Sequence, residues 1–90
     1  MTPEDQSIVD KTVRGVLQDV LALPPQQVAA FRHDTPLFGT VPELDSMAVA
    51  GLLTELEDRL AIRIDDDEVD GDMMATFGAL VDFASRKAFT

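Results

Sequence analysis

Apolar residues recur at helical spacing in three stretches of the chain, and each stretch predicts a helix. The first helix covers residues 4–22, because Thr2 can cap a helix that has Pro3 in its first turn. It ends by Leu23, since a residue that precedes a proline disfavours helical geometry. Its apolar face consists of Val9, Val13, Val16, Leu17 and Val20.

The second stretch begins at Asp45 and Ser46, two residue types that cap helices well, and it ends near residues 60–61. A short helix is expected over residues 66–71, where acidic side chains suit the positive end of a helix dipole. Thr76 then caps the last helix. The apolar stripes of the two longer helices are Val49, Leu53, Leu56 and Leu60 in the earlier one, and Phe77, Leu80, Val81 and Ala84 in the later one.

Residues 24–45 contain four prolines and predict a long loop between the first two helices. Loops of this length are unusual in compact domains and are often functional. We expect the loop to lie against the core through its apolar residues, which are Val28, Phe31, Leu37, Phe38 and Leu44.

Together these elements predict an all-α fold, a four-helix bundle with a long loop between helices one and two and a short third helix. No repeat or linker divides the chain, so we expect a single domain over residues 1–90. The expected core consists of Val13, Val16, Leu17, Val20, Phe38, Leu53, Leu56, Ile64, Phe77, Leu80 and Val81.

The composition narrows the possible functions. The chain has 17 acids and 7 bases, which give a formal net charge of −10. This charge disfavours nucleic acids and anionic membranes and favours partner proteins with basic surfaces. The chain has no cysteine, which excludes disulfides, thiolate metal sites and cysteine nucleophiles. It shows no signal peptide and no apolar run long enough for a membrane span, so we expect a cytoplasmic monomer.

Ser46 is the leading candidate for chemistry. It follows the long loop and opens a helix, so its hydroxyl should be within reach of another enzyme. Backbone amides and the positive end of the helix dipole at such a position suit an attached phosphate. Asp45 beside it could bind a metal ion or a basic group of that enzyme. The alternative reading is that Ser46 only caps the helix.

Several motifs in this order resemble the acyl carrier protein family. Asp45-Ser46-Met47 matches the Asp-Ser-Leu that opens the second helix of that family, with Met in place of Leu. The stretch 62–68, which reads Ile-Arg-Ile-Asp-Asp-Asp-Glu, resembles the family's link into helix three. The stretch 76–83 resembles the start of its fourth helix, and the resemblance extends over about residues 8–87.

The resemblance implies a carrier that is not itself an enzyme. A phosphopantetheinyl transferase would attach a 4′-phosphopantetheine arm from coenzyme A to Ser46, and the thiol of the arm would hold an acyl group as a thioester. Asp45 and Met47 would flank the attachment site. Further partners would be acyl-loading, acyl-transferring or ketosynthase-type enzymes with basic surfaces. The residues expected to contact them are Asp45, Glu55, Glu57 and Asp58.

Three departures from the family pattern favour a dedicated carrier in a specialised fatty-acid, polyketide or related pathway. Residues 42–44 read Pro-Glu-Leu where many members have Leu-Gly-x. Ala48 and Gly51 occupy positions that are commonly acidic, and Thr54 occupies one that is commonly apolar. Two alternatives stay open: a peptidyl or aminoacyl carrier, and an acidic interaction module that never receives an arm.

Two other possible sites, a calcium-binding loop and a catalytic triad, lack residues that such sites require. The acidic run from Asp66 resembles a calcium-binding loop, but its twelfth position is Phe77 in place of the required Glu, so we predict no metal site. Ser46, His33 and an aspartate could form a catalytic triad, but Ser46 lacks the G-x-S-x-G elbow. A chain of 90 residues also leaves little room for a substrate cleft, so we predict no catalytic residues.

Overall fold

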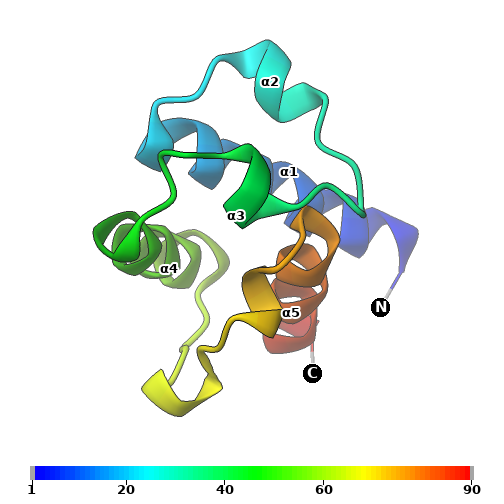
Figure 1. Ribbon diagram of the computed structural model, residues 1–90. Helices are drawn as coiled ribbons and strands as arrows, with labels where there is room; N and C mark the ends of the chain where they lie inside the picture. The colour runs from blue at the N-terminus through cyan, green and yellow to red at the C-terminus, as the bar shows by residue number, and fades with distance from the viewer. Residues whose placement is uncertain (1, 90) are drawn as a thin grey trace.

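The computed structural model describes residues 2–89 and contains three long helices, α1 (Pro3–Leu21), α4 (Ser46–Leu60) and α5 (Phe77–Phe89). Two short helices, α2 (Pro25–Ala29) and α3 (Leu37–Thr40), lie between α1 and α4. Two single 3-10 turns, η1 (Asp66–Glu68) and η2 (Asp72–Met74), lie between α4 and α5. Figure 1 shows α1 crossing above α4 and α5, with the turns η1 and η2 connecting those two helices at the other end of the molecule.

Local sequence explains both ends of α1. The Thr2 hydroxyl accepts a hydrogen bond from the Asp5 amide at 3.1 Å, and the Asp5 carboxylate accepts one from the Thr2 amide at 3.3 Å. This reciprocal capping box satisfies donors that the first turn leaves unpaired. At the other end Ala22 takes left-handed geometry, with φ at 53°, just before Leu23 and the two prolines. The expected helix over residues 4–22 is confirmed to within one residue at each end.

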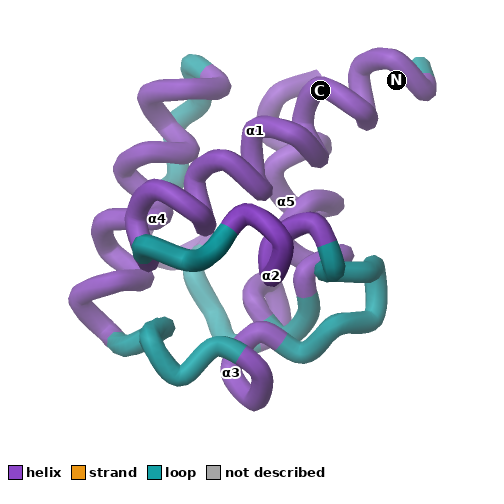
Figure 2. Tube along the Cα trace, turned by 90° about the horizontal axis from the view of Figure 1, so that it is seen from above, coloured by secondary structure: helices purple, strands orange, loops and turns teal. Residues whose placement is uncertain are grey.

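The segment expected as one long loop contains α2 and α3. Pro25 suits the first turn of α2 because its missing N–H would have no partner there. Where α3 begins, the segment is tied to the start of α5: the Leu37 amide donates to the Ala75 carbonyl at 3.1 Å, and the Phe77 amide donates to the Thr35 carbonyl at 2.9 Å. Figure 2 shows the loops on either side of α3 along one edge of the molecule. This edge is therefore tied to the start of α5 on the N-terminal side of α3.

The short helix expected over residues 66–71 is instead two separate 3-10 turns. Asp65 and Glu68 form a capping box across η1, which closes a single turn. Val69 then leaves helical geometry, with ψ at 115°, so the turn cannot continue. A second turn forms at η2, where the Asp70 carboxylate accepts a hydrogen bond from the Met73 amide at 2.9 Å.

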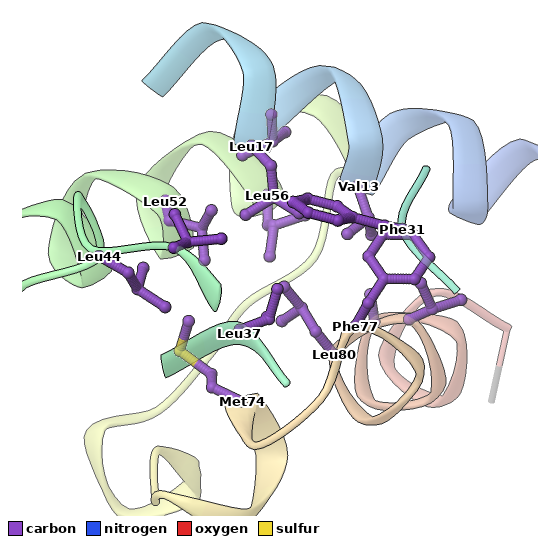
Figure 3. Packing of buried hydrophobic residues seen from close by; sticks show 14 of the residues in the cluster. Val13, Leu17, Phe31, Leu37, Leu44, Leu52, Leu56, Met74, Phe77 and Leu80 are labelled. Atoms are coloured by element: carbon purple, nitrogen blue, oxygen red, sulfur yellow. The ribbon is translucent and has the colours of Figure 1, made fainter. Parts of the chain in front are cut away.

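Side chains from every long helix meet in one apolar core (Figure 3). Each fully buried leucine or valine contributes roughly 1.5–3 kcal/mol relative to an exposed position. The segment between α1 and α4 also contributes, as expected, through Val28, Phe31, Leu37 and Leu44. The largest fully buried side chains belong to Leu17, Leu37, Leu52, Leu56, Met74 and Leu80.

The expectation that Phe38 belongs to the core was wrong. Its side chain is 52% exposed, while that of Leu37 is fully buried. Successive residues of a helix point about 100° apart, and in the single turn of α3 Leu37 points into the core whereas Phe38 points toward solvent. Val20, Leu53 and Ile64, also expected in the core, are half-buried at its margin.

Candidate functional site

At the corner between the loop and α4, buried residues are followed directly by exposed ones. Val41 and Leu44 are buried and fix the last turn of the loop against the core. Asp45, Ser46 and Met47 follow directly and are all exposed, Met47 to 86%. The chain thus presents three consecutive side chains to solvent from a backbone that the core holds still.

Asp45 caps α4. Its Oδ1 accepts a hydrogen bond from the Ala48 amide at 2.8 Å, and its own backbone is extended. Ser46 is the first residue of the helix, and within residues 2–89 its side chain makes no hydrogen bond. The reading of Ser46 as a helix cap is therefore wrong, because the residue before it fills that role. The hydroxyl is left accessible and unbonded.

The start of α4 also favours negative charge. The first amides of a helix have no partner inside it, and the aligned peptide dipoles place roughly half a positive charge there. The Ala48 amide is taken by Asp45 and the Val49 amide by the Asp45 carbonyl. The amides of Ser46 and Met47 lie before these in the same turn, where an attached phosphate would benefit from them.

A groove of about 450 Å³ begins at Ser46 and runs along α4. One wall is the face of α4, and the other is the segment that follows α4 and includes η1. The groove is lined by Ser46, Val49, Ala50, Leu53, Thr54, Glu57, Ile64, Asp66 and Val69. The larger apolar side chains among these are half-buried, so they leave apolar surface open to the groove. A larger hollow of about 630 Å³ lies between η2 and α5, but Ser46 does not line it.

Sequence reasoning had assigned Leu53 and Ile64 to the core and had not identified the groove. No pattern in the sequence marks the groove, because the apolar positions of α4 form a single stripe about 100° wide, the ordinary width of a packed helix face. These positions are Val49, Leu52, Leu53, Leu56 and Leu60.

The three acids within α4 that were expected to contact partners, Glu55, Glu57 and Asp58, do not share one outward face. Glu55 lies 3.4 Å from Arg59, whose guanidinium also binds Asp19 of α1 at 2.8 Å. This ion-pair cluster joins α4 to α1, and the Asp19 hydrogen bond foremost raises the pKa of Arg59. The cluster occupies the helix face opposite the groove. The Glu55 carboxylate is thus already paired with a cation of the same chain, Arg59.

Glu57 lies on the groove side, and its Oε2 accepts a hydrogen bond from the Ile64 amide at 2.8 Å. Asp58 is exposed and makes no hydrogen bond or ion pair within the described chain. Of the three acids of α4, Asp58 is therefore the one directed to solvent without an intramolecular partner.

The second wall of the groove is also tied to α5. Glu68 Oε1 accepts a hydrogen bond from Lys87 Nζ at 2.9 Å, and both side chains are about three-quarters covered. This bond, with that of the Asp65 amide, holds the pKa of Glu68 below its ordinary value.

His33 takes no part in the Ser46 corner. Its ring lies against Gly78 of α5, and its Nε2 is 3.4 Å from Asp82 Oδ2. The hollow that His33 lines is formed by α1 and α5, and Ser46 is not among its residues. The triad of Ser46 and His33 rejected from the sequence has no counterpart in the fold.

Comparison with known proteins identifies the fold and the family. The sequence profile described as "Phosphopantetheine attachment site" matches residues 11–84. The chain belongs to this family. A solution structure of a holo acyl carrier protein from Nitrosomonas europaea superposes with a TM-score of 0.78, at 34% sequence identity over 96% of each chain. No curated protein sequence matches the chain significantly.

As a member of the phosphopantetheine attachment family, the chain is a non-catalytic carrier and phosphopantetheine is its prosthetic group. The all-α carrier fold and the resemblance stated from the sequence are both confirmed. Within residues 2–89, no helix is both long and apolar enough to cross a membrane.

Proposed function

We propose that Ser46 Oγ is the atom that bears the phosphopantetheine arm. The observation that carries the proposal is the exposed, unbonded hydroxyl of Ser46 at the first turn of α4 and at the mouth of the groove. The residues around it fit a phosphodiester, because the first amides of α4 and its dipole favour an anion. The arm, when bound, supplies the thiol that a chain without cysteine lacks.

We further propose that the cargo is an acyl chain sheltered in the groove beside Ser46. Val49, Leu53, Ile64 and Val69 give the groove apolar walls, which suit an alkyl chain better than an aminoacyl group with its charged amine. The 34% identity to an acyl carrier protein supports the same preference over a peptidyl carrier. Membership of the phosphopantetheine attachment family argues against the module without an arm.

The proposed partners are a phosphopantetheinyl transferase and the enzymes that load, transfer or extend the acyl group. The net charge of −10 favours basic surfaces on them. Asp45, Met47 and Asp58 are the exposed residues of this end and face of α4 that could contact such surfaces. The departures at Ala48, Gly51 and Thr54 favour a specialised fatty-acid, polyketide or related pathway.

Intact-protein mass tests the attachment site. The apo protein is incubated with coenzyme A and a broad-specificity phosphopantetheinyl transferase, and its mass should rise by one phosphopantetheine. Ser46→Ala should fold and gain no mass. Ser7→Ala is the matched control, because Ser7 is also exposed on a helix, and it should be modified as the wild type is. Modification of Ser46→Ala would refute the assignment, and an unmodified wild type would favour the module without an arm.

A further inference from the structure

The groove ends where α4 is tied to the segment after it. Glu57 and Ile64 both line the groove, and the Ile64 N–H donates to Glu57 Oε2 at 2.8 Å. Ser46 lies at the opposite end. The 11 residues between positions 46 and 57 correspond to about 16 Å along α4 at a rise of 1.5 Å per residue. The Glu57–Ile64 bond therefore crosses the groove about three helical turns from Ser46.

The wall opposite α4 is held by polar contacts as well as by two half-buried apolar side chains. At its start, Ile64 is bound to Glu57 of α4, and at η1, Glu68 is bound to Lys87 of α5. The acids Asp66 and Asp67 between these points are exposed, and Ile64 and Val69 are only half-buried. Since Ile64 and Val69 pack against the core but are only half-buried, the two polar contacts add to what fixes this wall relative to α4. Of these two, the Glu57 contact joins the wall directly to α4 across the groove.

We propose that Glu57 sets the length of acyl chain that the groove can enclose. By holding the Ile64 amide, it keeps the two walls together and closes the end of the groove remote from Ser46. The proposal rests on the proposed function, since the chain must enter from an arm on Ser46. It also gives Glu57 a role within the molecule, as a positioning residue, in place of the partner contact expected from the sequence.

The physical consequence is a limit on the stabilisation that cargo provides. Each methylene enclosed between Val49, Leu53, Ile64 and Val69 leaves water and stabilises the folded state, because a ligand of the folded state shifts the unfolding equilibrium. A chain that reaches Glu57 must then either break the Glu57–Ile64 bond or leave its end in water. Further methylenes beyond that point should add no stability.

The test uses the holo protein loaded with saturated straight chains from butyryl to palmitoyl, with loading verified by intact mass. The melting temperature of each acyl form, relative to the holo form, is plotted against chain length. In the wild type it should rise with length and then level off. In Glu57→Ala the levelling should move to chains longer by about four carbons, roughly the 5.4 Å of the next turn of α4. Glu57→Gln should level off where the wild type does, because its amide oxygen can still accept the Ile64 N–H.

Asp58→Ala is the matched control, since Asp58 is the neighbouring acid but forms no bond with the residues that the structure describes, and its profile should follow the wild type. A purely structural brace would lower every melting temperature of Glu57→Ala and leave the levelling point unmoved, and that result overturns the proposal. So does a wild-type curve that never levels off.

Hydrogen exchange at the Ile64 amide of the wild type gives a second reading that needs no variant. The amide should stay protected with every chain below the limit, because such chains do not reach the Glu57–Ile64 bond. Loss of protection with those shorter chains overturns the proposal. Failure of the proposed function is distinguishable, because it appears earlier, as the absence of the arm in the mass spectrum.

Discussion

Alanine at the two residues that open α4 should have different effects on stability, because only one of them caps the helix. The Asp45 carboxylate accepts the Ala48 amide at 2.8 Å, and loss of such a cap costs about 1 kcal/mol. The carboxylate also lies at the positive end of the helix dipole, which adds about 0.3–1 kcal/mol. Asp45→Ala should therefore lower the free energy of unfolding by about 1–2 kcal/mol. At about 4–8 °C for each kcal/mol, the melting temperature of this domain should fall visibly.

Ser46→Ala should change the free energy of unfolding by less than about 0.5 kcal/mol, because the Ser46 hydroxyl holds no backbone group and alanine has the higher helix propensity. Urea denaturation of the apo proteins, followed by far-UV circular dichroism, measures both variants. If Ser46→Ala loses as much stability as Asp45→Ala, Ser46 shares the cap and the geometry described for this corner is wrong.

Asp45→Asn separates the cap from the charge at the same position. Asparagine caps helices about as well as aspartate, so this variant should keep most of the wild-type stability. Its negative charge is gone, and any slowing of arm attachment by a phosphopantetheinyl transferase then reports charge recognition alone. Such a defect should shrink at high salt. An attachment rate equal to that of the wild type at low salt would show that the partner does not read this charge.

Four further results are expected. Gly51→Ala should raise the free energy of unfolding by about 1 kcal/mol, because a Cβ there meets nothing closer than 3.6 Å. Gly78→Ala should instead lower the free energy of unfolding by about 1–3 kcal/mol, because the added Cβ would clash with the His33 ring. Urea denaturation measures both glycine variants, and a more stable Gly78→Ala than Gly51→Ala would contradict the packing around these two glycines. Acid should remove the stability contributed by Glu68, since hydrogen bonds from Lys87 and a backbone amide hold the pKa of Glu68 below its ordinary value of 4.5. That contribution is complete above the ordinary pKa of Glu68 and is lost as the pH falls through its pKa in the folded state. The melting temperature of Glu68→Gln should therefore fall less steeply with acid than that of the wild type. Identical plots of melting temperature against pH for the two proteins would exclude this contribution. Calcium and magnesium at millimolar concentration should raise the melting temperature alike, because nine of the 17 acids fall between the second half of α4 and the start of η2 and repel one another. Sodium chloride should raise it only at higher ionic strength. A flat response to all three salts would show that the repulsion among these acids is unimportant, and a response to calcium alone would reveal a specific calcium site.

The long helices could be predicted because their apolar residues follow the helical period and because residues with strong local preferences mark their ends. The cap of α4 could not be assigned to one residue, since Asp45 and Ser46 are adjacent and both residue types cap well. Phe38 was misplaced because no period operates in a segment that forms one short turn, so the direction of its side chain follows from tertiary contacts.

The role of Glu57 was hidden for a different reason. An acid on a helix surface has the same sequence pattern whether it faces solvent, a partner or a neighbouring backbone. Its hydrogen-bond donor is the amide of Ile64, and every residue other than proline has such a group. Sequence alone therefore indicates that Glu57 is on the surface of α4, and only the fold indicates which neighbour it binds.

The departures from the family pattern at Gly51 and Thr54 can be explained together from the surroundings of these residues on α4. Gly51, where an acid is common, faces Val20 of α1, since a Cβ added to it would lie 3.6 Å from Val20 Cγ1. Thr54 donates its hydroxyl to the Ala50 carbonyl at 3.0 Å, so the two together present a neutral surface. The fully exposed residues of α4 between Ser46 and Asp58, which are Met47, Ala50 and Thr54, are consequently uncharged. Screening at physiological salt limits exposed charges to a range of about 8 Å. The charge of the acidic segments can therefore steer a partner toward the molecule, whereas contact next to Ser46 must rest on apolar surface, above all the Met47 side chain, together with the charges of Glu43 and Asp45, which are both exposed.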